Sequence, residues 1–379
     1  MYENSFMKIC FLAHNLRQDN GGGVFSLRLI RGLQSALGAR VIVFAAVPSG
    51  MPFERPILSL NIFGMIRALP EIRRSIRTCD AVHAFDVFPY GFLGALISLG
   101  LGKKIIITAI GSGSIVPLYH YFQARLARWA LRRADKVIAI SRFTRAEILK
   151  KVPRRAIEVI NPGVDADFFG DTQTSRYDAA RYKPYIASVG QLRWRKGYHF
   201  SIRGFAKVAA RFPALHYVIV GKKYKEDYYM RLCALIKELH LEGRVFILED
   251  VATREELADV YREAELFCLF SQNVNHDVEG FGQVFLEAAA AGLPVVGSKN
   301  CGIDDAVRDG ENGILVPTRS ADDFADAILA ILCDEKLKKE MGMRSRAFAR
   351  ASGWEQRIEE YVDVYQQMRA FPVTSQVLR

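Results

Sequence analysis

Cysteine is scarce in this chain of 379 residues, and its six copies are scattered. No two of them stand at the Cys-x-x-Cys spacing of zinc and redox sites, so we expect neither a metal site nor a disulfide framework. Long hydrophobic runs are also absent, because the longest covers residues 92–101 and a membrane-spanning helix needs about 20 residues. The first residues lack the pattern of a secretory signal, and we therefore expect a cytoplasmic protein.

Acidic residues are few in the first half of the chain. Residues 1–180 contain 24 lysines and arginines against 13 aspartates and glutamates, whereas residues 181–379 contain 28 of each kind. The whole net charge of +11 therefore lies in the first half. Such an excess predicts an anionic partner, either an anionic membrane surface or nucleic acid. We expect no nucleic acid, because the sequence contains no recognisable reader module.

Short apolar runs alternate with helical patterns along the whole chain. This alternation predicts parallel sheets of βαβ units, and two series of runs predict two doubly wound α/β domains. The expected strands are residues 8–13, 41–47, 81–85, 104–108 and 136–140 in the first series, and residues 185–189, 216–220, 244–248, 266–270, 294–296 and 313–316 in the second. A polar stretch with Pro162, Gly163 and Pro184 predicts a linker over residues 161–184.

A glycine-rich segment at residues 19–24 follows the first expected strand and precedes a helix expected over residues 24–37. Glycines let a ligand approach the backbone closely, and the start of a helix attracts anions. Gly22 and Gly23 are therefore candidate phosphate contacts. The alternative is a tight strand-to-helix turn, since neither the GxGxxG nor the Walker pattern is present.

A basic loop follows the strand expected at residues 185–189. It contains Gln191, Arg193, Arg195 and Lys196, at the end of a strand where α/β folds bind ligands. A lysine at such a place neutralises a diphosphate as a point charge. The loop is therefore a candidate diphosphate-binding segment, and the alternative is a solvated basic loop.

Residues 279–296 form the strongest candidate site, with a loop, an alanine-rich helix, a glycine stop and a strand in that order. Glu287 lies eight residues after Glu279, about two helical turns further on. Backbone N–H groups at the start of this helix predict an anion site, beside which a carboxylate binds sugar or ribose hydroxyls. The residues of this predicted anion site are Gly280, Phe281, Gly282 and Gln283.

These segments together resemble the retaining glycosyltransferases of family 4. EGFGQVFLEAAAAGLPVV resembles that family's E-x7-E region, NGGGVFSLRLIRGL its glycine loop, and SVGQLRWRKGYHFSIRGF its first donor-domain strand and basic loop. The resemblance implies the GT-B fold, two Rossmann-like domains that face each other across a cleft. It implies an acceptor domain over residues 1–172, a nucleotide-sugar domain over residues 173–354, and a last helix over residues 355–379 that crosses back to the first domain.

The resemblance also implies a reaction. A hexosyltransferase of this kind moves a sugar from a UDP- or GDP-sugar to a hydroxyl of a glycan or lipid-linked acceptor, with retention, in the synthesis of cell-surface polysaccharide or lipopolysaccharide. Glu287 is expected to bind the ribose, Glu279 the hydroxyls of the transferred sugar, and Lys196 the leaving diphosphate. Neither a cofactor nor a metal is expected. Together with the basic first half, this predicts a peripheral protein at the inner face of the cell membrane.

Two positions depart from the family pattern. Gln191 stands where the family often has arginine, and Ile110 stands where it often has histidine. Arg193 or Arg195 is a candidate replacement for the arginine, and His14 for the histidine. These departures keep open a nucleotide-sugar-binding partner subunit without catalysis. A nucleotide-sugar epimerase on the same fold is a further alternative, although it needs an acid/base pair that we do not identify.

Two basic stripes in the first half are candidates for membrane contact. The first combines Arg67, Arg73, Arg74 and Arg77 with apolar residues over residues 62–77. The second has four cations at helical spacing, namely Arg125, Arg128, Arg132 and Lys136. Basic amphipathic helices lie on anionic membranes. The alternative is that each helix packs its apolar side on the sheet and holds its cations in solvent.

Overall fold

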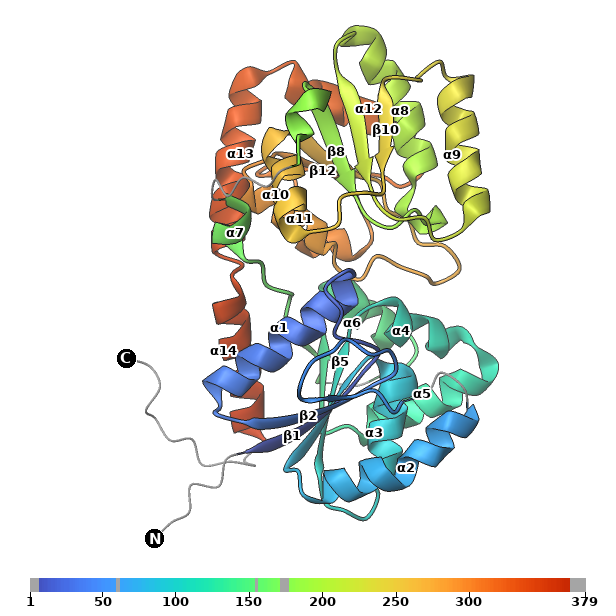
Figure 1. The fold of residues 1–379 in the computed structure, drawn as a ribbon, viewed down its shortest axis with the longest axis vertical. Helices are drawn as coiled ribbons and strands as arrows, with labels where there is room; N and C mark the ends of the chain where they lie inside the picture. Colours follow the sequence, from blue (N-terminus) through green and yellow to red (C-terminus); the bar gives the residue numbers. More distant parts are fainter. Residues whose placement is uncertain (1–6, 59–61, 154–155, 171–176, 369–379) are drawn as a thin grey trace. The chain divides into compact units, whose positions relative to one another are not determined.

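The chain is described by a computed structural model over residues 7–58, 62–153, 156–170 and 177–368 (Figure 1). It divides into two compact units, each built around its own sheet. Unit 1 comprises Met1–Pro162 and Trp354–Arg379, and unit 2 comprises Gly163–Gly353.

The division falls ten residues before the expected boundary at residue 172, because the segment after Pro162 packs within unit 2. The backbone N–H of Val164 donates to the carbonyl of Ser352 (3.0 Å), and the ring of Phe169 packs edge-on against Tyr261. The last helix lies in unit 1 and begins at Trp354, one residue earlier than the sequence predicts.

The sheet of unit 1 is parallel throughout, in the order β3-β2-β1-β4-β5-β6-β7. Its strands are β1 (Lys8–Ala13), β2 (Arg40–Ala45), β3 (Glu54–Arg55), β4 (Ala81–Phe85), β5 (Lys104–Ala109), β6 (Lys136–Ala139) and β7 (Glu158–Val159). Its α-helices are α1 (Gly21–Ala36), α2 (Ile62–Arg77), α3 (Phe92–Ile97), α4 (Ser112–Ile115), α5 (Tyr121–Arg133), α6 (Arg142–Leu149) and α14 (Trp354–Gln367).

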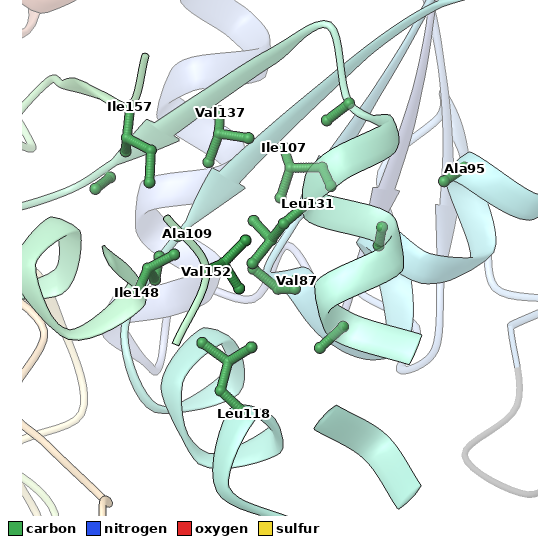
Figure 2. Close-up of a cluster of buried hydrophobic side chains, with 14 of the residues drawn as sticks. Val87, Ala95, Ile107, Ala109, Leu118, Leu131, Val137, Ile148, Val152 and Ile157 are labelled. Atoms are coloured by element: carbon green, nitrogen blue, oxygen red, sulfur yellow. The ribbon is translucent and has the colours of Figure 1, made fainter. Parts of the chain in front are cut away.

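Helices α2, α3 and α5 cover one face of this sheet, and two buried clusters hold them there. In the first cluster, Leu131 of α5 packs with Ile107 of β5 and Val137 of β6 (Figure 2). In the second, Ile72 of α2 packs with Val82 of β4. These strands read as nearly continuous apolar runs because helices cover a parallel sheet on both faces.

The opposite face of the same sheet carries α1 and α14. His83 of β4 is fully buried there, and its ring nitrogens bond the hydroxyls of Tyr365 (2.9 Å) and Thr108 (2.8 Å). Burial lowers the pKa of His83 to about 3, so its imidazole is neutral at physiological pH. His83 therefore ties the last helix to the sheet.

The sheet of unit 2 is also parallel, in the order β10-β9-β8-β11-β12-β13. Its strands are β8 (Tyr185–Val189), β9 (His216–Val220), β10 (Val245–Leu248), β11 (Leu266–Leu269), β12 (Val295–Ser298) and β13 (Gly313–Val316). Its α-helices are α7 (Ala166–Gly170), α8 (Tyr198–Arg211), α9 (Glu226–Glu238), α10 (Arg254–Glu263), α11 (Gln283–Ala290), α12 (Ala321–Leu332) and α13 (Glu335–Arg350).

The second predicted basic stripe is not one surface. Lys136 belongs to strand β6, where its ammonium pairs with Glu158 at 2.5 Å, and only the three arginines lie on helix α5. Among the described helices, none combines the length and the hydrophobicity that a bilayer crossing requires.

Candidate functional site

The basic loop after β8 and the loop after β11 touch at the carboxyl edge of the unit 2 sheet. A Cβ atom on Gly197 would lie 1.9 Å from the carbonyl oxygen of Phe270, and Gly197 has a positive φ of 67°. Only glycine fits this close approach without strain. The backbone N–H of Gln272 then donates to the carbonyl of Arg195 (2.7 Å). These contacts hold the basic loop beside the segment that leads to α11.

A buried ion cluster joins these two loops, and Glu279 stands at its centre. Its carboxylate oxygen Oε2 accepts hydrogen bonds from Lys196 Nζ (2.5 Å), Arg195 Nη1 (2.9 Å) and Ser271 Oγ (2.9 Å). Arg195 also pairs through Nε with Asp277 (3.3 Å). Glu279 and Lys196 are 8% and 7% exposed, so the pair is largely shielded from water. The two residues predicted to be catalytic thus contact each other directly.

Electrostatics favour the charged form of Glu279. Burial by itself opposes ionisation, but the charges of Lys196 and Arg195 outweigh it and lower the pKa of Glu279 to about 2. Burial also lowers the pKa of Lys196, against the opposing charge of Glu279. At neutral pH the cluster is an ion network in which one carboxylate oxygen takes three donors. Both cations therefore have fixed positions before any ligand arrives.

The start of helix α11 lies directly after this cluster. Gly282 caps the helix with a φ of 87°, a left-handed conformation that favours glycine. A Cβ atom on Gly302 would lie 2.1 Å from the carbonyl oxygen of Gly280, and the N–H of Gly302 donates to the carbonyl of Glu279 (2.9 Å). The first N–H groups of a helix lack intrahelical acceptors, so this end of α11 offers donors to an anion.

Glu287 lies within the same helix and has a different environment from Glu279. Its Oε2 accepts a hydrogen bond from the hydroxyl of Tyr261 (3.1 Å). Burial raises the pKa of Glu287 to about 7, although the charge of nearby Arg254 lowers it in part. Arg254 is in turn held by Asp165, with 2.6 Å between its Nη2 and the carboxylate. The two glutamates of the E-x7-E pattern therefore ionise in different pH ranges, because the pKa is about 2 for Glu279 and about 7 for Glu287.

The other residues of unit 2 that were predicted to contact the donor differ in how accessible their side chains are. Gln191 is exposed, and its Oε1 accepts a hydrogen bond from Arg193 Nε (2.7 Å). Phe281 is buried, so only its backbone is available to a ligand. The side-chain amide of Gln283 donates to the carbonyl of Gly163 (2.6 Å) and is therefore committed to the backbone. Of the two candidate replacements for the family arginine, Arg195 rather than Arg193 provides the second cation at Glu279.

In unit 1 the predicted glycine loop is the first turn of α1, which begins at Gly21. The N–H of Gly23 donates to the side chain of Asn20 (2.9 Å), and a Cβ on Gly23 would lie 2.1 Å from the carbonyl oxygen of Arg17. Gly23 is thus required by local packing, and its N–H already has a partner. Gly22 is exposed, so its backbone is accessible, and its contact with a phosphate stays a prediction.

The two weaker candidates of unit 1 follow the carboxyl ends of β1 and β5, the strands on either side of β4. His14 is exposed, and its Nδ1 bonds the hydroxyl of Tyr90 (2.9 Å). Ile110 donates its backbone N–H to Asp86 (3.1 Å), whose carboxylate also accepts from Ser114 Oγ (2.8 Å). Ile110 therefore contributes a backbone group here, and that group is bonded to the side chain of Asp86.

Comparison with known proteins identifies the family of this chain. The family described as "Glycosyl transferases group 1" matches residues 171–348, and "Glycosyltransferase Family 4" matches residues 19–168. A GDP-mannose-dependent alpha-(1-6)-phosphatidylinositol monomannoside mannosyltransferase of Mycolicibacterium smegmatis is 30% identical over 276 residues, which are 69% of each chain. The chain belongs to glycosyltransferase family 4.

Solved structures show the fold of this family 4 glycosyltransferase. HepE of Anabaena, solved with UDP and glucose, has a TM-score of 0.76 at 22% identity and covers 94% of this chain and 99% of its own. WaaG, a glycosyltransferase involved in lipopolysaccharide biosynthesis, has a TM-score of 0.70 at 18% identity over 94% and 99% of the two chains. The fold is GT-B, as the sequence predicts.

Four side chains of this glycosyltransferase were not singled out from the sequence. Ser271 and Asp277 complete the ion cluster, and Tyr261 and Arg254 surround Glu287. The sequence gives one indication of where Arg254 lies. Thr253 and Glu256 form a capping box, which places Arg254 at the start of α10. No group of three or more histidine, cysteine or carboxylate side chains suited to a metal ion occurs within the described residues.

Proposed function

We propose that this family 4 protein is a glycosyltransferase that takes its sugar from a UDP- or GDP-sugar bound to unit 2. The observation that carries the proposal is the ion cluster of Glu279, Lys196 and Arg195, placed directly before the start of α11. Two fixed cations and the helix N–H groups form a site for the diphosphate, and Glu287 binds the ribose. The UDP and the glucose in the HepE structures support this choice of donor.

The proposed roles follow from where charge develops. When the bond between sugar and diphosphate breaks, negative charge grows on the diphosphate, and cations already in place stabilise it most at that moment. Lys196 is the principal one, because it is the more buried cation and is positioned by Glu279. The hydrogen bonds that Glu279 accepts from Lys196, Arg195 and Ser271 all end on Oε2, and we propose that Oε1 binds the hydroxyls of the sugar.

We also infer that the reaction retains the anomeric configuration and uses no cofactor and no metal ion. Lys196, Arg195 and the α11 N-terminus supply the positive charge that a divalent cation supplies to a leaving diphosphate in other transferases. Retention is supported by the family resemblance of the E-x7-E segment, which Glu279 and Glu287 begin and end.

For the acceptor we propose a hydroxyl of a glycan or a lipid-linked glycan, in the synthesis of a cell-surface polysaccharide. The names of the relatives support this class, since one acts on a phosphatidylinositol mannoside and another takes part in lipopolysaccharide biosynthesis. Unit 1 is the proposed acceptor side, with His14 and Ile110 at the carboxyl edge of its sheet.

One experiment separates this proposal from its two rivals. The purified chain is incubated with a panel of UDP- and GDP-sugars, and both nucleotide release and the identity of the sugar are measured. A transferase releases nucleotide, because water slowly replaces the acceptor. An epimerase changes the sugar without releasing nucleotide, and a partner subunit binds the nucleotide but does neither. If a chain that binds UDP or GDP releases nucleotide from no donor, the proposal is contradicted; an unchanged sugar then favours the partner subunit, and a changed sugar favours the epimerase.

A further inference from the structure

The strand order of unit 1 reverses between β1 and β4. From β1 the chain continues through β2 and β3 on one side, and from β4 it continues through β5, β6 and β7 on the other. In open parallel sheets, ligands bind outside the carboxyl ends of the two strands at such a reversal. In unit 2 the reversal lies between β8 and β11, whose loops carry the ion cluster of the proposed donor site. The β1–β4 reversal is therefore a candidate site for the second substrate.

Asp86 is the first residue after β4, and its backbone is strained. Its φ of 69° and ψ of 150° fall in a region that is populated almost only by glycine. Its N–H donates to the carbonyl of Thr108 (2.8 Å), and its carbonyl accepts from the N–H of Gly91 (3.0 Å), so hydrogen bonds on both sides fix this conformation. Residues with such strain cluster at functional sites. The strain therefore indicates that the side chain of Asp86 has a function.

The surrounding residues hold the carboxylate of Asp86 in one position. Ser114 Oγ (2.8 Å) and the N–H of Ile110 (3.1 Å) both donate to Oδ1. Ser114 is fully buried, and its hydroxyl also accepts from the N–H of Val87 (3.2 Å). A Cβ atom on Gly113 would lie 2.4 Å from Oδ2, so an alanine there would collide with the carboxylate. Asp86 is nevertheless partly exposed at this end of the sheet.

His14 lies on the other side of the reversal, as the first residue after β1. It is exposed, and its Nδ1 bonds the hydroxyl of Tyr90 (2.9 Å), a residue that is 4% exposed. Partial burial of the ring lowers the pKa of His14, so the imidazole is neutral at physiological pH. Burial, and then the charge of Asp86, raise the pKa of Tyr90. Tyr90 is thus close to both side chains and links the two sides of the reversal.

We propose that Asp86 binds the acceptor through a hydroxyl of an uncharged sugar, with Oδ2 as the hydrogen-bond acceptor and His14 as a second contact. The inference rests on the proposed glycosyltransferase function and specifies the chemistry of the acceptor. A carboxylate accepts hydrogen bonds from hydroxyls but repels a phosphate or a carboxylate of the ligand. A neutral imidazole has one donor and one acceptor, which also suits a hydroxyl. A phosphorylated sugar should therefore be a poor acceptor.

The test gives the full-length protein its UDP- or GDP-sugar together with matched pairs of small acceptors. The pairs are glucose with glucose 6-phosphate, mannose with mannose 6-phosphate, and galactose with galactose 6-phosphate, each at high concentration. Nucleotide release and disaccharide formation are both measured. At least one neutral sugar should accelerate nucleotide release, and its phosphate should give an acceleration at least tenfold smaller.

The first variant is Asp86→Asn. Its amide oxygen has to accept from Ser114 and Ile110, so the amide nitrogen takes the place of Oδ2. The variant should lower kcat/KM for the neutral sugar at least tenfold and narrow the preference over the phosphorylated sugar. This preference is a ratio, so a smaller folded fraction does not change it. The matched control is Asp135→Asn, because this carboxylate accepts from the N–H of Ile105 (2.9 Å) at the amino end of β5.

A second variant moves the carboxylate without changing it. The methyl group of Gly113→Ala should displace Oδ2 of Asp86 and raise KM for the neutral sugar several-fold. Thermal unfolding of each variant verifies that unit 1 is folded. A titration with UDP or GDP verifies that the nucleotide still binds.

Three results overturn the inference. The first is a phosphorylated sugar that accelerates release as much as its neutral partner. The second is no acceleration by any neutral sugar in a chain that releases nucleotide slowly in water. The third is an Asp86→Asn protein that matches Asp135→Asn in both kcat/KM and preference. A chain that releases nucleotide from no donor contradicts the proposed function itself and the inference with it, so the two failures are told apart.

Discussion

Replacing Glu279 by glutamine is the perturbation whose consequences the structure specifies most fully. The substitution keeps the size of the side chain and removes its charge. Lys196 and Arg195 then stay close together beneath the protein surface without the carboxylate that accepts from both of them. We expect the variant to lose stability before any effect on catalysis is considered.

The magnitude follows from two considerations. Removing one partner of a buried ion pair costs about 3–5 kcal/mol, because the remaining charge is left uncompensated. The pKa of Glu279 is about 2 against an ordinary value of 4.5, which corresponds to about 3 kcal/mol of folding free energy. Because the folded pKa is depressed, this contribution is complete above pH 4.5 and is lost as pH falls toward 2.

The difference in stability between the wild type and Glu279→Gln should shrink as pH falls. At pH 7 the variant should be less stable than the wild type by roughly 3 kcal/mol. At pH 3.5 the difference should be smaller by about 1 kcal/mol, since the wild type has by then lost part of the contribution of Glu279. Lys196→Met should cost less than Glu279→Gln, because Arg195 still pairs with the carboxylate.

The assay is urea unfolding followed by the fluorescence of Trp194, the single tryptophan of residues 163–353. The other two tryptophans, Trp129 and Trp354, are replaced by phenylalanine in all proteins, so the signal reports unit 2 alone. Equal stability of wild type and Glu279→Gln at pH 7, or a difference that grows as pH falls, would refute the reasoning.

Three further predictions concern other side chains. Glu287→Gln should stabilise the unliganded chain by about 1–3 kcal/mol at pH 8 and should have no such effect at pH 4. The reason is that burial raises the pKa of Glu287 in the folded chain to about 7, so the wild type loses stability as pH rises from 4.5 to 7. Thermal unfolding at both pH values measures this, and a stabilisation at pH 4 contradicts it. Lys196→Met should lower kcat for nucleotide release at least tenfold with little change in nucleotide affinity, and steady-state kinetics that show only a raised KM would point to Arg195 instead. Arg73→Ala should lower the free energy of unfolding of unit 1 by about 1.5–3 kcal/mol, because two charged hydrogen bonds to backbone carbonyls are lost; Arg74→Ala is the exposed control, and urea unfolding that gives equal losses for the two refutes the structural role of Arg73.

Much of the fold follows from the sequence, since strands buried on both faces are apolar runs that differ from their surroundings. Two strands were missed, β3 (Glu54–Arg55) and β7 (Glu158–Val159), because they are only two residues long and lie at the edges of the sheet. Their glutamates and arginine give no apolar run for a pattern to detect. The start of α1 was placed three residues late, because the glycines that open this helix are typical of a loop.

The sequence predicts the site residues that belong to a local motif. It does not predict contacts between segments that lie far apart in the sequence. Glu279, Glu287 and Lys196 follow from local patterns. Arg195 was one of two candidate replacements for an arginine, and its choice depends on the approach of the loops at Gly197, which no local pattern encodes. The contact between Tyr261 and Glu287 crosses 26 residues, and a tyrosine within a helix gives no sign of its partner.

Donor binding by unit 2 is tested directly by a calorimetric titration of the wild-type chain with UDP and with GDP, repeated for Glu287→Ala and for Glu238→Ala. Glu238 is an exposed glutamate in α9 whose side chain is 63% exposed, so its removal controls for the loss of a carboxylate alone. We expect one of the two nucleotides to bind the wild type and Glu238→Ala to leave its affinity unchanged. Glu287→Ala should weaken this affinity about 10- to 100-fold, the equivalent of about 1.5–3 kcal/mol. Equal affinity for Glu287→Ala and the wild type, or no binding of either nucleotide to the wild type, would contradict this expectation.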